Sequence, residues 1–315
     1  MEKQGAENNK KPMETINLAD SQIGTNIQEI MDCRLFKEPQ VMGGEQSGGQ
    51  SVTASWQILK YSGGQLHEKE DTVASEYPLT LRIDGEEFAT IVCSPSDLED
   101  MVIGFLASEG VIRVIEDIRT LKLNVERGFA DVELTVKQSI SKDSYNKRFI
   151  GSCCGKSRQF YFHNDARTAK TIPIRTRITA ARCLELMNQL QQASAEFHHT
   201  GGVHNAALCC ADSSAQLTSL VRTDIGRHNA LDKIFGQCIR HRIPLTGKVI
   251  VFSGRVSSEV LLKVAKIGVG VLLSKSAPTG LALELAHDLG IAVIGFIRGH
   301  SFNVYTHSER LEIEN

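Results

Sequence analysis

The chain lacks any long apolar run. No uninterrupted stretch approaches the roughly 18 residues that suggest a membrane span. The first residues, Met1-Glu-Lys-Gln-Gly, are not followed by an apolar segment of the kind found in a signal peptide. These two absences predict a cytoplasmic protein with no membrane partner.

The chain also lacks an excess of charge of either sign. Its 315 residues include 35 Lys and Arg against 37 Asp and Glu, a formal charge of −2. No basic field of the kind that recruits nucleic acid is therefore expected. Apolar residues make up 41% of the chain, which is ordinary for a soluble globular protein, and the length suits two domains.

Cysteine is sparse, with eight residues in the whole chain and no C-x-x-C spacing. This excludes the dense disulfide framework of a small secreted domain, and cysteine-based metal sites generally need such spacing. What is present instead is two pairs of immediate neighbours, Cys153-Cys154 and Cys209-Cys210. A disulfide between neighbours strains the intervening peptide, so we expect free thiols.

Composition and periodicity divide the chain into three parts. Residues 1–51 are rich in Gln, Glu, Asn and Lys and end in a Gly-rich stretch, which predicts a mostly disordered extension. Residues 52–145 are expected to form a small α+β domain, and residues 146–315 a larger α/β domain.

The small domain is predicted from a hairpin and a helix. Leu79, Leu81 and Ile83 alternate with polar residues before Asp84-Gly85, a type I′ turn signal, and a second strand follows. Ser94-Pro95 then indicates a helix start, with Pro95 near the first helical position and Gly110 as the stop.

The larger domain is predicted from alternating apolar strands and helices. Helices are expected over about 179–199 and 228–240, whereas the segment after Thr200 could be a strand or a buried helix. Strands beginning at Lys248, Val269 and Ile291 are separated by two helices. This order predicts a βαβαβ unit with a parallel sheet buried on both faces.

Cations follow each strand of that unit. Arg255, Lys275 and Arg298 lie in the three segments after the strands, with His300 beside the last. Ligands of open parallel sheets bind beyond the carboxyl ends of the strands, and two of these segments lead into helices whose free N–H groups attract anions. We expect a phosphate-bearing ligand here; the alternative is that these charges are solvated loop residues. No nucleotide-binding glycine motif is present.

Two histidines have open interpretations. In Asp224-Ile-Gly-Arg-His-Asn-Ala-Leu-Asp-Lys233, His228 could move a proton near neutral pH. The alternative is a capping network, with Asp224 or Asn229 as the N-cap and Asp232 and Lys233 in solvated first turns. His204, after two glycines, is equally compatible with a core position.

The two cysteine pairs differ in their sequence neighbours. Cys153-Cys154 lies among Lys147, Arg148, Lys156 and Arg158. Such cations lower a thiol pKa and favour the nucleophilic thiolate. Cys209-Cys210 has no cation near it in the sequence and suits a buried apolar segment.

Several long motifs resemble the FdhD family of formate dehydrogenase accessory sulfurtransferases. They occur in order over about 52–311 and begin with Glu76-Tyr-Pro-Leu-Thr-Leu-Arg-Ile-Asp-Gly and Gly104-Phe-Leu-Ala-Ser-Glu-Gly. The others are Thr200-Gly-Gly-Val-His, the Asp224–Lys233 motif, Ser253-Gly-Arg-Val-Ser-Ser-Glu, Ser274-Lys-Ser-Ala-Pro-Thr and Gly295-Phe-Ile-Arg…Val304-Tyr-Thr-His.

The resemblance implies a cytidine-deaminase-like larger domain and a homodimer. It further implies a persulfide on a loop cysteine, with sulfur passing from a cysteine desulfurase to the molybdenum cofactor, bis-molybdopterin guanine dinucleotide, for formate dehydrogenase. Cys153 and Cys154 are the matching cysteines. The family segment that contributes to guanine dinucleotide binding matches Phe296, Ile297, Arg298, Gly299, His300 and Ser301, to which Arg255 and Lys275 are added from the strand-end analysis.

Two departures from the family pattern matter. The family loop is usually C-x-x-C-G, whereas Cys153-Cys154-Gly155 lacks the two spacer residues. Cys153 then takes the persulfide-bearing place by a narrow preference. Thr223 stands where the family often has an acidic residue, so no acid–base role is assigned there.

Two other functions are alternatives to sulfur transfer. A zinc deaminase needs H-x-E and P-C-x-x-C, but His204-Asn-Ala lacks the glutamate and C-x-x-C is missing, so no zinc is expected. A chaperone that binds the molybdenum cofactor without catalysis, with incidental cysteines, stays open.

Overall fold

The computed structural model describes residues 51–136, 148–150, 171–172, 176–193, 200–212 and 220–313. They belong to one compact unit that extends from Gln40 to Asn315. Cys153, Cys154 and most of the predicted N-terminal extension lie outside the described residues.

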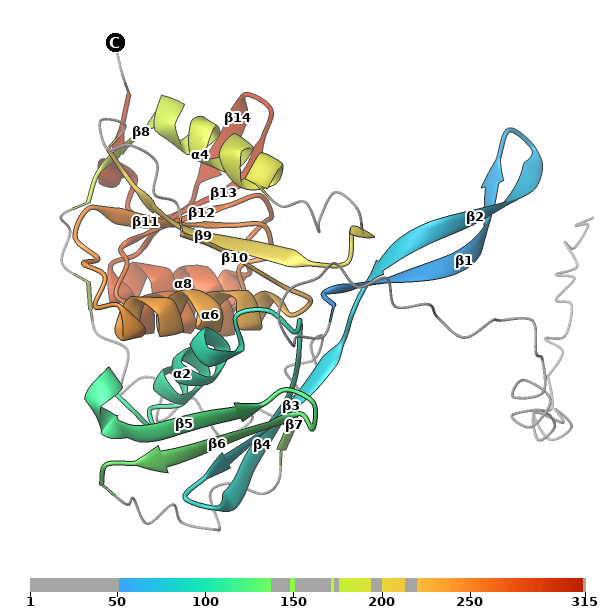
Figure 1. Cartoon of the computed structure of the whole chain (residues 1–315). Helices are drawn as coiled ribbons and strands as arrows, with labels where there is room; N and C mark the ends of the chain where they lie inside the picture. The colour runs from blue at the N-terminus through green and yellow to red at the C-terminus, as the bar shows by residue number, and fades with distance from the viewer. Residues whose placement is uncertain are drawn as a thin grey trace, which may run out of the picture. The chain divides into compact units, whose positions relative to one another are not determined.

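A five-stranded sheet has the strand order β5-β6-β3-β4-β7 (Figure 1). Its strands are β3 (Tyr77–Ile83), β4 (Glu86–Cys93), β5 (Ile118–Asn124), β6 (Phe129–Leu134) and β7 (Arg148–Ile150). The expected hairpin is confirmed, because Asp84 and Gly85 join β3 to β4 with φ values of 49° and 88°, as a type I′ turn requires. The last strand, β7, pairs in parallel with β4.

Helix α2 (Leu98–Ser108) packs on this sheet but begins later than the sequence indicated. Pro95 is not near its first turn, because Ser94 is held by the other half of the molecule. The Ser94 N–H donates to a carboxylate oxygen of Asp224 at 2.9 Å, and its hydroxyl accepts the N–H of Ile225 at 3.0 Å. The predicted stop at Gly110 is confirmed by its φ of 74°.

A six-stranded sheet has the strand order β10-β9-β11-β12-β13-β14. Its strands are β9 (His204–Cys210), β10 (Leu220–Asp224), β11 (Lys248–Phe252), β12 (Val271–Ser274), β13 (Ala292–Arg298) and β14 (Ser301–Val304). Helices α7 (Ser258–Ile267) and α8 (Gly280–Leu289) connect β11, β12 and β13, which are parallel. The βαβαβ unit is confirmed, the segment after Thr200 is a strand, and antiparallel β9, β10 and β14 make the whole sheet mixed rather than parallel.

Helices cover both faces of the six-stranded sheet (Figure 1). On β11, Ile250 and Phe252 pack in a core with α6 (Arg227–Arg240), α7 and α8. The intervening Val249 and Val251 pack in a second core with α4 (Ala180–Ala193). The alternation of side chains along a strand therefore assigns each residue to one of two buried layers.

The two sheets are joined where α2 crosses α6, and glycines form the crossing. A Cβ on Gly104 would lie 1.7 Å from the backbone oxygen of Asp232, and one on Gly236 would lie 1.9 Å from that of Asp100. Only a hydrogen in place of the side chain permits this approach. Buried polar bonds complete the joint: the Ser108 hydroxyl donates to Asp232 at 2.6 Å, and Asp232 also pairs with Lys263.

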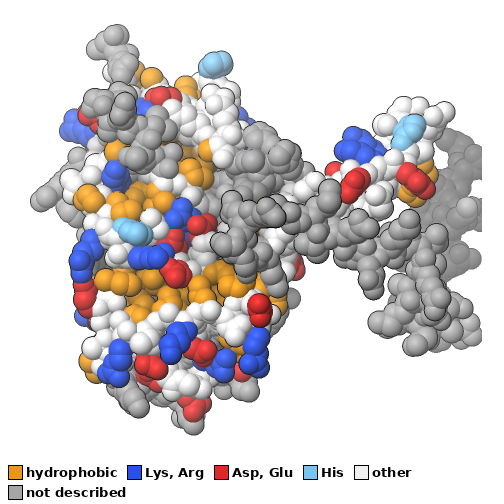
Figure 2. Space-filling view, in the orientation of Figure 1, with side chains coloured by type: hydrophobic (Ala, Val, Ile, Leu, Met, Phe, Trp, Pro, Cys, Tyr) orange, Lys and Arg blue, Asp and Glu red, His pale blue; other side chains and the backbone are white. Residues whose placement is uncertain are grey.

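The sequence did not predict three smaller elements. These are the hairpin of β1 (Thr53–Ser62) and β2 (Gln65–Ala74), strand β14, and the parallel pair of β8 (Ile178–Thr179) with β15 (Leu311–Glu312). Most hairpin side chains are exposed, including Leu59, Tyr61 and Leu66. On the face shown in Figure 2, acidic and basic side chains of the described residues are interspersed. Among the described residues, no helix is long and apolar enough to cross a membrane.

Candidate functional site

The carboxyl ends of β11, β12 and β13 are bound together by hydrogen bonds between the segments that follow them. The Ser276 hydroxyl donates to the carbonyl oxygen of Ser253 at 3.1 Å, and the Ser274 hydroxyl donates to that of Gly254 at 2.9 Å. The Phe296 N–H donates to the carbonyl oxygen of Ser276 at 3.2 Å. The three segments therefore form one rigid edge, as the parallel order of the strands predicts.

The predicted cations lie on this edge with different exposures. Arg255 and Arg298 are exposed, whereas Lys275 is half-buried. The edge also has two helix N-termini, since α7 begins at Ser258 and α8 at Gly280. Cations and free N–H groups are the donors that phosphate oxygens prefer, so the described residues suit a phosphate-bearing ligand.

A bulge in β13 turns Phe296 outward. The register of β13 against β14 shifts between Gly295 and Arg298, and Phe296 has a φ of 58° that non-glycine residues rarely adopt. Phe296 is 42% exposed, and the Arg298 guanidinium carbon lies 4.2 Å from the centroid of its ring. The edge thus presents an aromatic face beside a cation.

The other residues of the segment predicted to bind a cofactor differ in their exposure to solvent. Gly299, His300 and Ser301 are exposed, and the Ser301 hydroxyl donates to the carbonyl oxygen of Arg298 at 3.3 Å. Ile297 is buried and packs in the core against the face covered by α4.

The polar motif of 224–233 separates into two groups of residues. Asp224, Asn229, Asp232 and Lys233 are all buried. Asp224 pairs with Lys233 at 2.8 Å, and the Asn229 amide donates to the carbonyl oxygen of Val92 at 2.9 Å. The predicted capping network is therefore wrong in detail, since Gly226 is the N-cap and Asp232 and Lys233 are not solvated.

The other two side chains of this motif, Arg227 and His228, lie in the first turn of α6. The Nε2 atom of His228 lies 3.2 Å from Oε2 of Glu259, in the first turn of α7, and the two side chains are 16% and 25% exposed. Gly254 lies beside Arg227, since a Cβ on this glycine would be 3.4 Å from Cβ of Arg227, although the tighter contact, at 2.9 Å, would be with the Phe252 ring. These residues extend the sheet edge toward α6.

His204 lies at the start of β9, opposite Asp224 at the end of β10. Burial lowers the pKa of His204, the positive charges of Arg227 and Arg255 lower it further, and Asp224 opposes them. His204 therefore belongs to the same electrostatic environment as the cations of the edge.

Most of the described cysteines are buried and unreactive. Burial raises the pKa of Cys93, Cys183 and Cys238 to about 12 and that of Cys209 to about 11. A thiol with such a pKa is almost wholly protonated at neutral pH and is a poor nucleophile. These four residues are thus poor candidates for carrying sulfur.

Cys210 differs from its neighbour. It is half-buried, and the Lys248 ammonium lies 2.9 Å from its sulfur. The sequence placed no cation near this pair because Lys248 is distant along the chain, but antiparallel pairing of β9 and β11 sets the two residues opposite each other. Cys209 confirms the buried interpretation, and Cys210 departs from it.

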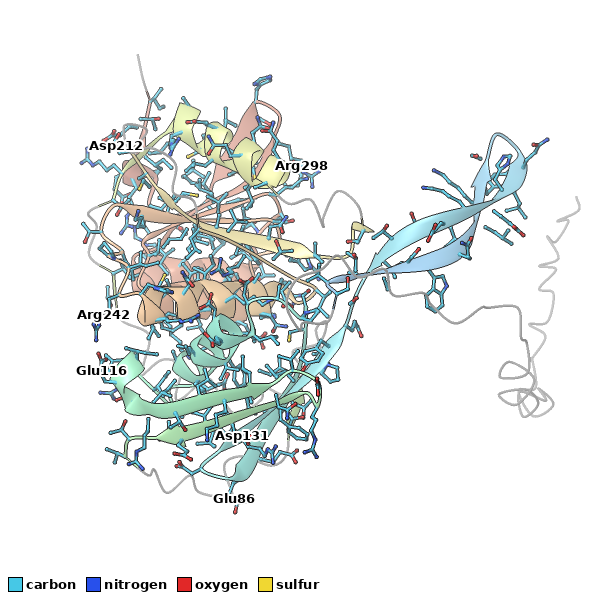
Figure 3. All side chains as sticks on the ribbon, viewed as in Figure 1. Glu86, Glu116, Asp131, Asp212, Arg242 and Arg298 are labelled. Carbon is cyan, nitrogen blue, oxygen red and sulfur yellow. The ribbon has the colours of Figure 1, made fainter. Side chains whose placement is uncertain are left out.

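A pocket of about 290 Å³ lies at the other end of the six-stranded sheet and is lined by Arg182, Asp212 and Gly247 among others. Figure 3 shows Asp212 and Arg298 at opposite ends of that sheet. The pocket therefore does not belong to the edge that carries Arg255, Lys275 and Arg298. The described residues bring together no group of three His, Cys, Asp or Glu side chains that could hold a metal ion.

The described residues define a mixed α/β protein with cations along one sheet edge, and comparisons with known proteins define its family. A family model described as the FdhD/NarQ family matches residues 74–312. The chain therefore belongs to the FdhD/NarQ family.

Similar proteins include two relatives named sulfur carrier protein FdhD. The relative from Geobacillus kaustophilus is 58% identical over 256 residues, which are 81% of this chain and 96% of the relative. The relative from Bacillus licheniformis is 54% identical over 264 residues, or 84% of this chain and 99% of the relative. A solved structure from Desulfotalea psychrophila, described as a formate dehydrogenase accessory protein, is 22% identical with a TM-score of 0.65, over 83% of this chain and 100% of that one. This last likeness concerns the fold.

The sequence did not single out Glu259 or the orientation of Phe296. Glu259 lies within a quoted motif and near the start of a predicted helix, where acidic side chains are common. Its pairing with His228 joins two helices and has no local signal. The bulge at Phe296 could have been suspected from Gly295 within an apolar strand, since glycine there often marks one.

Proposed function

We propose that the protein is a sulfur carrier for formate dehydrogenase. It takes sulfur from a cysteine desulfurase as a persulfide on Cys153 or Cys154 and passes it to the molybdenum cofactor bis-molybdopterin guanine dinucleotide. The names of the relatives support the sulfur-carrier role. The proposal includes a cytoplasmic location, a homodimer, and a cytidine-deaminase-like arrangement of the six-stranded sheet and its helices.

The observation that carries the proposal is the rigid cationic edge. A guanine dinucleotide is an anion with an aromatic base, and the edge offers both kinds of partner. Arg255, Lys275 and Arg298 would hold phosphate oxygens through charge-assisted hydrogen bonds. Phe296, exposed beside Arg298, would offer its ring to the base.

Strand β7 is the described element that directly precedes the cysteine pair in the sequence. Ile150 pairs with Ile91 of β4, and β7 runs in the same direction as β4. Strand β4 leads to Ser94, whose N–H binds Asp224 just before α6. Strand β7 therefore runs toward the connection between β4 and α2, and Cys153 follows Ile150 by three residues in the sequence.

The loading step is a thiol–persulfide exchange. A cysteine thiolate of this chain attacks the outer sulfur of the desulfurase persulfide and forms a new S–S bond. The donor S–S bond breaks, and its electron pair leaves with the inner sulfur of the desulfurase cysteine as a thiolate. The proton lost by the attacking thiol balances the one that the leaving thiolate finally takes up, so no oxidant is needed.

Intact-mass measurement tests the carrier role directly. The full chain is incubated with a cysteine desulfurase and cysteine, and the added mass of sulfur is located by peptide mapping. We expect adducts confined to the Cys153-Cys154 peptide, lost in the double variant Cys153→Ala/Cys154→Ala and retained in Cys210→Ala. The single variants Cys153→Ala and Cys154→Ala identify the carrier. An adduct that persists in the double variant contradicts the assignment of these cysteines.

The chaperone alternative is separated by a second measurement. The double cysteine variant is expressed in place of the wild-type protein, and formate dehydrogenase activity is measured in the cell extract. Loss of activity with normal protein level supports sulfur transfer. Normal activity shows that the edge alone suffices and that the protein delivers the cofactor without carrying sulfur.

A further inference from the structure

The cavity at the end of the six-stranded sheet opposite the cationic edge has a volume of about 290 Å³. It borders the start of α4, because Thr179, just before this helix, and Arg182, in its first turn, both line it. The segments that follow β9 and precede β11, together with β15, supply the other walls. Ligand pockets usually begin near about 300 Å³, so the cavity suits a small molecule.

The inner part of the cavity is positively charged. The N–H groups in the first turn of a helix have no partners within that helix. The Thr179 hydroxyl accepts the N–H of Arg182 at 3.2 Å, while the preceding residues of the turn, Ala180 and Ala181, border the same space. A helix N-terminus carries a partial positive charge, and the Arg182 side chain, which is 4% exposed, adds a full one. This part of the cavity therefore favours an anionic group.

Arg182 keeps hydrogen-bonding capacity for such a group. Its Nη1 donates to a carboxylate oxygen of Glu185 at 2.7 Å, and its Nη2 donates to the carbonyl oxygen of Cys210 at 3.3 Å. Its Nε atom is buried and has no hydrogen-bond partner among the described residues. A guanidinium has five N–H donors, and the Glu185 side chain is 47% exposed, so water screens its charge. Arg182 can thus bind a further acceptor in the cavity that it lines.

The rim of the cavity carries charges of both signs. Asp212, Glu312 and Arg177 line it and are exposed, and Figure 3 labels Asp212 at this end of the sheet. Arg177 and Glu312 are 3.5 Å apart, with side chains 66% and 49% exposed, and an ion pair so accessible to water is weak. Two carboxylates at the rim repel a ligand with several negative charges, such as phosphate, and attract an ammonium group.

We propose that this cavity binds a free α-amino acid. The carboxylate of the ligand lies at the start of α4 beside Arg182, and its ammonium group lies near Asp212 and Glu312. A zwitterion of this kind places its single negative charge in the positive interior and its positive charge at the rim. The site is separate from the cationic edge and does not depend on the proposed sulfur transfer.

Binding is tested by calorimetry with the full chain and each of the twenty standard L-amino acids in turn. We expect at least one of them to bind with a Kd below about 1 mM. Two analogues of that amino acid, one without the ammonium group and one without the carboxylate, should each bind about tenfold more weakly, because each loses a charge-assisted contact. Inorganic phosphate should bind more weakly than the amino acid.

Two variants separate the two ends of the ligand. Asp212→Asn should weaken binding of the amino acid about tenfold and leave the affinity for the analogue without an ammonium group unchanged. Arg182→Lys, whose fold is checked by circular dichroism, should weaken the binding of both, because the fork of the guanidinium is lost. Glu86→Gln is the matched control, since it removes an exposed carboxylate from β4, far from Asp212 in Figure 3. Its affinity for the amino acid should equal that of the wild type.

Three outcomes overturn the proposal. Absence of binding by all twenty amino acids shows that the cavity is not such a site. Tighter binding of phosphate than of any amino acid shows a simple anion site. Equal affinity of the wild type, Asp212→Asn and Glu86→Gln for the amino acid shows that the rim does not hold the ammonium group. None of these results bears on the sulfur-carrier proposal, which is tested at Cys153 and Cys154.

Discussion

The α2–α6 crossing and the carboxyl edge of the six-stranded sheet differ in whether their charged side chains are buried or exposed. At the crossing, Asp224, Asp232, Lys233 and Lys263 are almost fully buried, and each has a partner of opposite charge. At the edge, Arg255 and Arg298 remain exposed on segments that hydrogen bonds hold in place. A run of charged residues in the sequence can therefore form internal ion pairs, while isolated cations after strands can remain exposed, as the proposed ligand-binding surface requires.

Substituting the glycines of the crossing should give the largest effect. In Gly104→Ala or Gly236→Ala, a methyl group must enter space within 2 Å of a backbone oxygen, at 1.7 and 1.9 Å, so the helices have to separate. We expect either variant to lose more than about 4 kcal/mol of unfolding free energy, measured by urea denaturation. Gly280→Ala is the control, because a Cβ there meets nothing within 4 Å. A loss below about 1 kcal/mol in both crossing variants would show that the helices adapt easily.

Removing the edge cations should give an intermediate effect on binding and little on folding. Guanosine diphosphate is a suitable probe, since it carries the base and the phosphates of the proposed cargo. Arg255→Ala and Arg298→Ala should each weaken its binding about tenfold, as expected for the loss of a charge-assisted hydrogen bond, measured by calorimetry. The unfolding midpoint should stay at the wild-type value.

Arg242→Gln is the matched control for these variants. Arg242 is exposed, pairs with Glu116, and lies far from Arg298 (Figure 3). Its removal should leave nucleotide affinity unchanged. Equal weakening in all three variants would indicate a general charge effect rather than a site.

The pH dependence of stability should show the smallest effect. His204 has a folded-state pKa below its ordinary value of 6.5, with burial as the main cause. The unfolded chain therefore binds a proton at a higher pH than the folded chain does. The contribution of His204 to the unfolding free energy is fully present above about pH 6.5. It is lost as the pH falls toward the lowered pKa of His204.

His204→Gln should lose this component of the pH dependence. The unfolding free energies of the wild type and the variant are compared between pH 8 and pH 5, with His241→Gln as control. The difference between wild type and variant should change across this range. A difference that is constant with pH would show that His204 titrates alike in both states.

The parts of the molecule that sequence could predict are those with local signals. Asp84-Gly85 between two alternating segments is a strong local signal for a tight hairpin, and the apolar strands from Lys248 onward alternate with helices in a short repeat. The position of the cationic edge followed from that repeat, because parallel strands bring their carboxyl ends together. The positions of Arg255, Lys275 and Arg298 at one edge were predicted in this way, and their role in binding a ligand stays a prediction.

The parts that sequence could not predict depend on contacts between distant residues. Gly104 gives no sign that Asp232 will lie against it, and His228 gives none of Glu259. Cys210 likewise acquires Lys248 only through strand pairing. In each case the contact depends on where a distant residue lies in the fold. Neither the spacing nor the composition of the sequence records that position.

The crossing of α2 and α6 has a consequence for synthesis. The first sheet and α2 leave the ribosome well before α6, yet the inner face of α2 is covered by residues such as Phe235 and Ile239 of that later helix. A nascent chain that ends before residue 240 must therefore keep this apolar surface uncovered, in a state prone to aggregation. The two sheets should mature together rather than one after the other, and truncation before α6 should yield insoluble protein.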